Sequence, residues 1–343
     1  MNNTASHKRQ VAKNRQMVIL TIFAMLLVII GHSDITDDFK DLWIYKWVFT
    51  FHMPLFFFIS GFLFCLTNPP ERMNKTSFGS FMKKKTIRLL LPFLFINTII
   101  FIVKSCYIQD KSMIQHPVEF TWDSFLYSTF FSPLGFMWFL PCLFTVFLIA
   151  YPIWKIVKEK FKAQTNYILL TMSGLIVVFY VLSLFKSTKF MQFSPALFYL
   201  CFFFLGICYC EYKRQVDSVL KKYWILLVLI FVPLSVFMVF DGAAGAVMGV
   251  LGSLVIALII EDKCPDKLVK LSDLCYTVFL LSYFPQMFIR GPIAHRFPEL
   301  NQYMLSTVSF VTGLIIPVLV GLVLLALKKR HKLWGKLAIL VGV

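Results

Sequence analysis

The chain has 343 residues, of which 59% are hydrophobic, 17% are aromatic and only 15% are charged. Soluble domains are nearer half apolar and a quarter charged, so this composition excludes an ordinary water-soluble enzyme and a disordered chain. The formal net charge of +17 would suggest a nucleic-acid partner in a soluble protein. In a chain this apolar, the expected partner is membrane lipid, and no nucleic acid is required.

Long uncharged stretches recur along the chain. A helix needs about 20 apolar residues to cross the hydrocarbon core of a bilayer, and most of these stretches are long enough. A run of small residues at 242–246 predicts close helix packing. We predict an all-α, polytopic membrane helix bundle of about ten transmembrane helices, within the charge-free intervals 16–33, 47–70, 89–103, 124–154, 163–185, 190–210, 223–240, 242–260, 274–289 and 300–327. The interval 124–154 is long, so its span is expected to begin near Phe136.

The basic residues fall mainly on one side of these predicted spans. With the N-terminus in the cytoplasm, 26 of the 34 lysines and arginines lie on the inner side and 8 on the outer side. Cytoplasmic loops carry such an excess, so both termini are predicted to be cytoplasmic. The predicted organisation is a cytoplasmic basic tail at 1–15, a single transmembrane domain at 16–327 and a cytoplasmic tail at 328–343.

Two of the six histidines fall within predicted spans. His32 ends the first span, and His52 lies a few residues into the second, which begins on the same side. The two imidazoles should therefore lie at similar depth and can face one cavity. Ionisable groups at membrane depth tend to be functional, and an imidazole can take a proton from an alcohol at neutral pH. On position alone, two interfacial histidines that cap helix ends, or a proton-coupled transporter, remain alternatives.

The residues around His52 support a functional site. Pro54 cannot donate a backbone hydrogen bond, so it frees the carbonyl of Thr50 and can kink the helix. Freed backbone groups in a membrane need a partner or a wet cavity. The dipeptide Ser60-Gly61 allows another helix to approach closely, and Asp34 can orient an imidazole.

Five short motifs resemble the acyltransferase-3 family, a group of bacterial multi-span O-acyltransferases that includes fucose-4-O-acetylase-like members. The most specific is FHMPLFFFISGF at 51–62. The others are LVIIGHS at 27–33, KKK followed by RLLLP within 83–92, MWFL at 137–140 and FFLG at 203–206. The resemblance covers most of the chain. Two positions depart from the common pattern: Thr21 replaces a basic residue, and Ser282 replaces a histidine of a late span.

The resemblance implies transfer of an acyl group, usually acetyl, from cytoplasmic acetyl-CoA to a hydroxyl of a surface or lipid-linked glycan. The protein would lie in the bacterial cytoplasmic membrane, with acyl-CoA as a co-substrate and without a bound cofactor. His32 and His52 match the family's two histidines, and Arg88 matches the basic residue that opens the third span. We expect no metal site, because the eight cysteines lack the paired spacing of metal ligands.

These residues suggest a mechanism. His32 would act as general base on the acceptor hydroxyl, or would briefly carry the acyl group, and Asp34 would orient it. His52 would bind or polarise the acyl carbonyl. An oxyanion needs hydrogen-bond donors at the developing charge, and the candidates for oxyanion or acceptor contacts are Ser33, Ser60 and Trp138.

The phosphates of coenzyme A need a basic site on the cytoplasmic side. Arg88, Lys84 and Lys85 are the candidates, and Lys75 and Lys83 lie beside them. Arg88 opens a predicted span, and a helix N-terminus attracts anions. The positive-inside bias alone is the alternative explanation for this cluster.

The predicted outer loop 109–135 is rich in aromatic residues, beside Glu119 and Asp123. Aromatic faces with carboxylates suit a sugar ring, and an interfacial aromatic belt is the alternative.

A different function class also remains open, because a polytopic exporter of a saccharide or small metabolite would have similar spans. The histidine pair discriminates between them, since only the enzyme needs both imidazoles together with an acyl-CoA.

Overall fold

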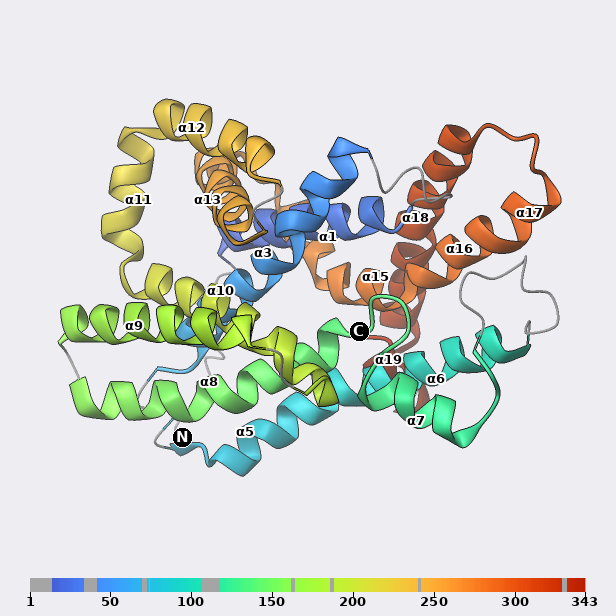
Figure 1. The fold of residues 1–343 in the computed structure, drawn as a ribbon, viewed down its shortest axis with the longest axis horizontal. Helices are drawn as coiled ribbons and strands as arrows, with labels where there is room; N and C mark the ends of the chain where they lie inside the picture. Colours follow the sequence, from blue (N-terminus) through green and yellow to red (C-terminus); the bar gives the residue numbers. More distant parts are fainter. Residues whose placement is uncertain are drawn as a thin grey trace, which may run out of the picture.

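The structure is a computed structural model that describes residues 14–33, 42–69, 73, 75–106, 118–161, 164–185, 188–239, 242–328 and 332–342. All regular elements in these residues are helices, and no strand is found among them (Figure 1). The predicted all-α class is confirmed.

The helices of the first half of the chain are α1 (Arg15–Gly31), α3 (Trp43–Thr67), α5 (Phe78–Lys85), the π-turn η1 (Thr86–Leu90), α6 (Leu91–Cys106), α7 (Trp122–Phe130), α8 (Phe139–Phe161) and α9 (Thr165–Leu184). Those of the second half are η2 (Phe190–Gln192), α10 (Phe193–Glu211), α11 (Lys213–Lys222), α12 (Trp224–Phe237), α13 (Gly242–Ile260), η3 (Glu261–Lys263), α14 (Asp266–Leu271), η4 (Ser272–Leu274), α15 (Cys275–Leu281), α16 (Tyr283–Phe288), the π-turn η5 (Ile289–Ile293), α17 (Ala294–Arg296), α18 (Gln302–Lys328) and α19 (Lys332–Leu340).

The described residues contain seven helices that are long and apolar enough to cross a membrane. They are Trp43–Thr67, Phe78–Cys106, Phe139–Phe161, Thr165–Leu184, Phe190–Glu211, Gly242–Lys263 and Gln302–Lys328. Two further helix pairs are bent, and counting each pair as one span gives up to nine. The structure therefore supports seven to nine spans and not the predicted ten, and the cytoplasmic placement of both termini stays a prediction.

The difference has identifiable causes. The helix α1 has 17 residues, which is about 26 Å of helix and at the short end for a span. The helices α11 and α12 meet at a bend of 92°. The predicted span 223–240 therefore contains only the 14 residues of α12, which is short for a membrane crossing. The pair Asp266–Leu281 and Tyr283–Arg296 is bent by 40°. Charge-free intervals measure apolarity, and they do not show where a helix bends.

The helix α3 is central to the bundle, where it contacts α1, α10 and α13 (Figure 1). Two glycines let α3 and α10 cross at backbone contact. A β-carbon on Gly61 would overlap the carbonyl oxygen of Phe203, and one on Gly206 would overlap that of Phe58. This crossing lies six to nine residues after His52 along α3.

The small residues of α13 pack against the N-terminal half of α3, so the close helix packing that the sequence predicted is confirmed. A β-carbon on Gly245 would lie 2.8 Å from Cγ2 of Thr50, and one on Gly249 would collide with the ring of Phe51. Glycine is therefore required where α13 passes the first turns of α3.

Arg88 is not at the start of a helix, which corrects the prediction that it could bind an anion at a helix N-terminus. The hydroxyl of Ser77 accepts the N–H of Ser80 and starts the helix at Phe78. The helix then continues through η1, so Arg88 lies within the candidate span Phe78–Cys106. The lysines before Arg88 are good helix formers, and they extend the helix into the predicted loop.

The predicted C-terminal tail contains the helix α19, which packs against α18 and α6. Its Ala338 is fully buried, so this segment is part of the bundle.

Candidate active site

The two histidines lie where α1 ends and α3 begins. His32 is the C-cap of α1, and its backbone N–H donates to the carbonyl of Val28 at 3.1 Å. The residue as a whole is partly exposed. His52 lies on α3 with only 3% of its surface exposed, and its Nδ1 is 2.8 Å from the carbonyl oxygen of Val48. Since a carbonyl can only accept, Nδ1 carries the proton in this bond, and the Nε2 of a neutral His52 is left as an acceptor.

Both imidazoles contact the same phenyl ring. The ring centroid of Phe49 lies 5.8 Å from that of His32 and 4.9 Å from that of His52, and both pairs are edge-on. Phe136, in the loop before α8, contacts His32 from another direction at 4.9 Å. The structure thus gathers the two rings in one largely aromatic environment.

A glutamine that the sequence analysis missed holds the end of α1. Gln286 on α16 is fully buried, and its Nε2 donates to the carbonyl of Ile29 at 2.9 Å and to the hydroxyl of Ser33 at 3.1 Å. Ser33 in turn donates its proton to Ile29 at 2.5 Å. An amide within the predicted span 274–289 was the only signal for Gln286 in the sequence.

The same contacts bear on Ser33 as an oxyanion donor. Its hydroxyl proton is already used by the carbonyl of Ile29, and its oxygen accepts from Gln286. Ser33 therefore fixes the turn that presents His32 and has no second proton to donate.

An arginine approaches this region from the π-turn η5. The guanidinium carbon of Arg290 lies 5.9 Å from the ring centroid of Tyr283, and its Nε donates to the carbonyl of Gln286 at 3.4 Å. The ring of Tyr283 contacts Phe136, which contacts His32. Arg290 therefore contacts the aromatic cluster that surrounds His32.

The remaining predicted residues lie apart from the histidines. Asp34 falls outside the described residues. Ser60 is eight residues from His52 along α3, which is about 12 Å of helix. Trp138 stacks on Tyr199 with ring centroids 5.7 Å apart and lines a separate cavity.

The three predicted basic residues line one cavity, near the opposite end of α3. This cavity of about 270 Å³ is lined by Thr67, Asn68, Thr76, Phe81, Lys84, Lys85 and Arg88. The ammonium of Lys85 lies 3.5 Å from the ring centroid of Phe147. From His52 to Thr67 is fifteen residues, or about 22 Å along the helix axis. The basic cavity and the histidines are therefore well separated along the bundle.

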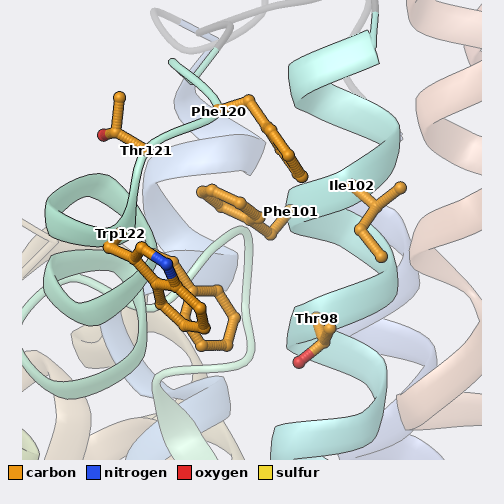
Figure 2. A pocket seen from close by; sticks show the side chains of 7 residues that line it. Thr98, Phe101, Ile102, Phe120, Thr121 and Trp122 are labelled. Carbon is orange, nitrogen blue, oxygen red and sulfur yellow. The ribbon is translucent and has the colours of Figure 1, made fainter.

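A third cavity, of about 310 Å³, lies between α6 and α7. In Figure 2, Phe101 and Ile102 come from α6, Phe120 and Trp122 come from the segment that leads into α7 and from its first turn, and the ring of Phe120 lies close to that of Phe101. Phe120 and Trp122 are 73% and 78% exposed. The predicted carboxylates Glu119 and Asp123 do not line it. Its apolar lining is typical of an interfacial aromatic belt more than of a sugar site.

The two positions that depart from the family pattern have local roles. The hydroxyl of Thr21 donates to the carbonyl of Met17 at 2.7 Å within α1. Ser282 is fully buried between α15 and α16, and its hydroxyl has no hydrogen-bond partner among the described residues. It lies one helical turn from Gln286.

The comparisons with known proteins bear on the family of the chain. The family model described as an acyltransferase domain, Acyl_transf_3, matches residues 19–327, which is nearly the whole chain. No curated protein and no solved structure matches the chain significantly. The family match shows that this multi-helix membrane chain belongs to the acyltransferase-3 family.

Proposed function

We propose that the protein is an O-acyltransferase that moves an acetyl group from cytoplasmic acetyl-CoA to a hydroxyl of a surface or lipid-linked glycan, in the bacterial cytoplasmic membrane. The observation that carries this proposal is the pair of imidazoles on Phe49, with His52 held by Val48. The family match supports the reaction class.

The hydrogen bond of His52 suggests how the pair divides the chemistry. A neutral His52 with its proton on Nδ1 cannot donate from Nε2, so it is unsuited to polarise an acyl carbonyl and well suited to accept a proton. We assign His52 as the general base on the acceptor hydroxyl. His32, partly exposed between Phe49 and Phe136, is assigned as the acyl carrier. Aromatic neighbours keep water away from an acyl-imidazole.

The proposed reaction has two steps. In the first, a ring nitrogen of His32 attacks the thioester carbon, the C–S bond breaks, and coenzyme A leaves as a thiolate that takes up the imidazole proton. In the second, the acceptor oxygen attacks the acyl carbon while its proton passes to Nε2 of His52. The C–N bond then breaks, and the proton returns to His32.

The basic cavity is the proposed site for coenzyme A. Lys84, Lys85 and Arg88 line one cavity. A general excess of basic residues on the cytoplasmic side would not require them to share a cavity, so their position supports an anion site. Arginine and lysine both bind phosphate well. The donor's extended arm would enter the bundle from this cavity and run along α3 towards the histidines.

The test uses membranes that contain the protein and radiolabelled acetyl-CoA. The native protein should transfer label to a glycan fraction, and His32→Ala should transfer none. Without an acceptor, label should remain on the native protein and be released by hydroxylamine. Full glycan labelling by His32→Ala would reject the assignment. An exporter of a saccharide would instead move its cargo without consuming acetyl-CoA.

A further inference from the structure

A cavity lined by the loop whose Phe136 contacts His32, distinct from the basic cavity and the aromatic one, has the lining of a sugar site. It measures about 550 Å³ and lies between the loop 131–138 and the start of α10. Its lining includes Trp138, Ser132, Gln192, Ser194 and Lys189. We propose that this cavity, called here the acceptor pocket, binds the acceptor saccharide and that Lys189 favours saccharides with a phosphate or carboxylate group. This inference rests on the proposed acyl transfer.

The lining combines the groups that recognise sugars. An indole offers a flat face for the apolar side of a pyranose ring, and it has an N–H donor at its edge. Two serine hydroxyls and one amide can bond to sugar hydroxyls. Ligand pockets typically measure about 300–1,000 Å³, so the acceptor pocket has room for one or two sugar rings.

The wall of the pocket is held in an unusual backbone conformation. Met191 and Gln192 have φ angles of 49° and 58°, which non-glycine residues seldom adopt. Two hydrogen bonds hold this turn: Gln192 Nε2 donates to the carbonyl of Phe131 at 3.0 Å, and Thr145 Oγ1 donates to that of Met191 at 2.9 Å. Strained turns persist where their surroundings fix them, and they cluster at ligand sites.

One loop joins the pocket to the catalytic histidine. Trp138 lines the pocket, and Phe136, two residues earlier, contacts the ring of His32. A saccharide in the pocket would therefore contact the same loop that contacts the imidazole. Such a position suits an acceptor, whose one reacting hydroxyl must reach His32 while the rest of the molecule is held.

Lys189 gives the pocket its charge preference. Among the described residues that line it, Lys189 carries the one charged side chain. An ammonium group attracts phosphate and carboxylate alike, and an exposed lysine at the rim would provide selectivity more than strong affinity. By contrast, the cavity in Figure 2 has no charged side chain in its lining.

The first experiment tests the pocket in membranes with radiolabelled acetyl-CoA. Trp138→Ala should lower glycan labelling about tenfold, while label still accumulates on the protein. The matched control Trp122→Ala removes an outer tryptophan that does not line the pocket, and it should label glycan normally. Normal labelling by Trp138→Ala would overturn the pocket, whereas a native protein that labels neither itself nor glycan would overturn the proposed function.

The second experiment tests the charge preference with defined acceptors. Purified protein that carries the label is mixed with glucose, glucuronate or glucose 1-phosphate, and the loss of label from the protein is followed. Both charged sugars should discharge the label about two- to fivefold faster than glucose, and Lys189→Gln should remove that difference. Arg296→Gln, another outer cation, should keep it. If all three sugars discharged the label equally fast, or if none discharged it, the preference would be refuted. If only one charged sugar discharged it faster than glucose, the result would show whether Lys189 favours the carboxylate or the phosphate.

Discussion

Gln286 and Ser33 are joined by a hydrogen bond of 3.1 Å between Nε2 and Oγ, although 253 residues separate them in the chain. Gln286 also donates to the carbonyl of Ile29. These bonds tie the bent helix pair near the C-terminus to the last turn of α1, which presents His32. The position of the proposed acyl carrier therefore depends on a residue far away in the sequence.

We predict that Gln286→Met slows acyl transfer. Methionine has a similar volume but cannot donate, so two buried hydrogen bonds are lost, each worth about 0.5–1.5 kcal/mol. A displacement of about 1 Å in a reacting group can cost on the order of 10²-fold in rate. The rate of glycan labelling should fall about 10- to 100-fold, with the KM for acetyl-CoA nearly unchanged.

The control for this variant is Gln302→Met, which changes an exposed glutamine at the start of α18. It should have native rates. If a folded Gln286→Met protein worked as fast as this control, the clamp on α1 would have no role in the reaction.

The second prediction separates the roles of the two histidines. His52→Asn keeps a donor near the position of Nδ1, so the bond to Val48 can persist while Nε2 is lost. Loss of a general base costs about 10²–10⁴-fold. His52→Asn should therefore become labelled by acetyl-CoA yet fail to pass the label to glycan, whereas His32→Ala should not become labelled. A His52→Asn protein that never becomes labelled would contradict this division of roles.

Much of the fold follows from the sequence because the bilayer constrains it strongly. Composition alone predicts a helical bundle, since a chain in lipid must satisfy its backbone hydrogen bonds internally. The count of spans was less accurate. The bend at Ser282 lies three residues before Pro285, which leaves the carbonyl of Leu281 without its helical donor. The bend at Tyr223 falls at the edge of a charge-free interval, and apolarity does not show the angle at which two helices join.

The site was predictable where its residues are close in sequence. A short connection between two antiparallel spans places His32 near His52, and both lie against Phe49. Gln286 and Phe136 reach the same region from distant segments, so a single sequence holds no signal that pairs them with His32. The role of Ser33 was equally hidden, because its hydroxyl is recruited by the backbone of its own helix.

The third prediction concerns the donor cavity. Arg88→Gln removes one cation from the cavity lining, and an exposed charge contributes modestly to binding. The KM for acetyl-CoA should rise about three- to tenfold, with kcat unchanged, and the effect should weaken at high salt because the interaction is screened.

Lys83→Gln provides the matched control for Arg88→Gln. Lys83 is exposed on the neighbouring helical turn, but it does not line the cavity. If both substitutions raised the KM equally, a diffuse positive potential at this face would explain the effect, and a defined site for coenzyme A would not.

The fourth prediction tests the close crossing between α10 and α3, the helix that carries His52. Gly61→Ala and Gly206→Ala each place a methyl group on a backbone carbonyl of the facing helix, and backbone cannot move aside as a side chain can. Overpacking costs about 1–3 kcal/mol, and more where nothing can relax. Both variants should lower the midpoint of thermal unfolding in detergent and lose activity in proportion.

Gly174→Ala on α9 is the control, because a β-carbon at Gly174 would meet no atom within 4 Å. Alanine is favoured over glycine in a helix by about 0.5–1 kcal/mol. This variant should therefore be as stable as the native protein or slightly more stable. Native stability in Gly61→Ala would mean that α3 and α10 do not cross at backbone contact.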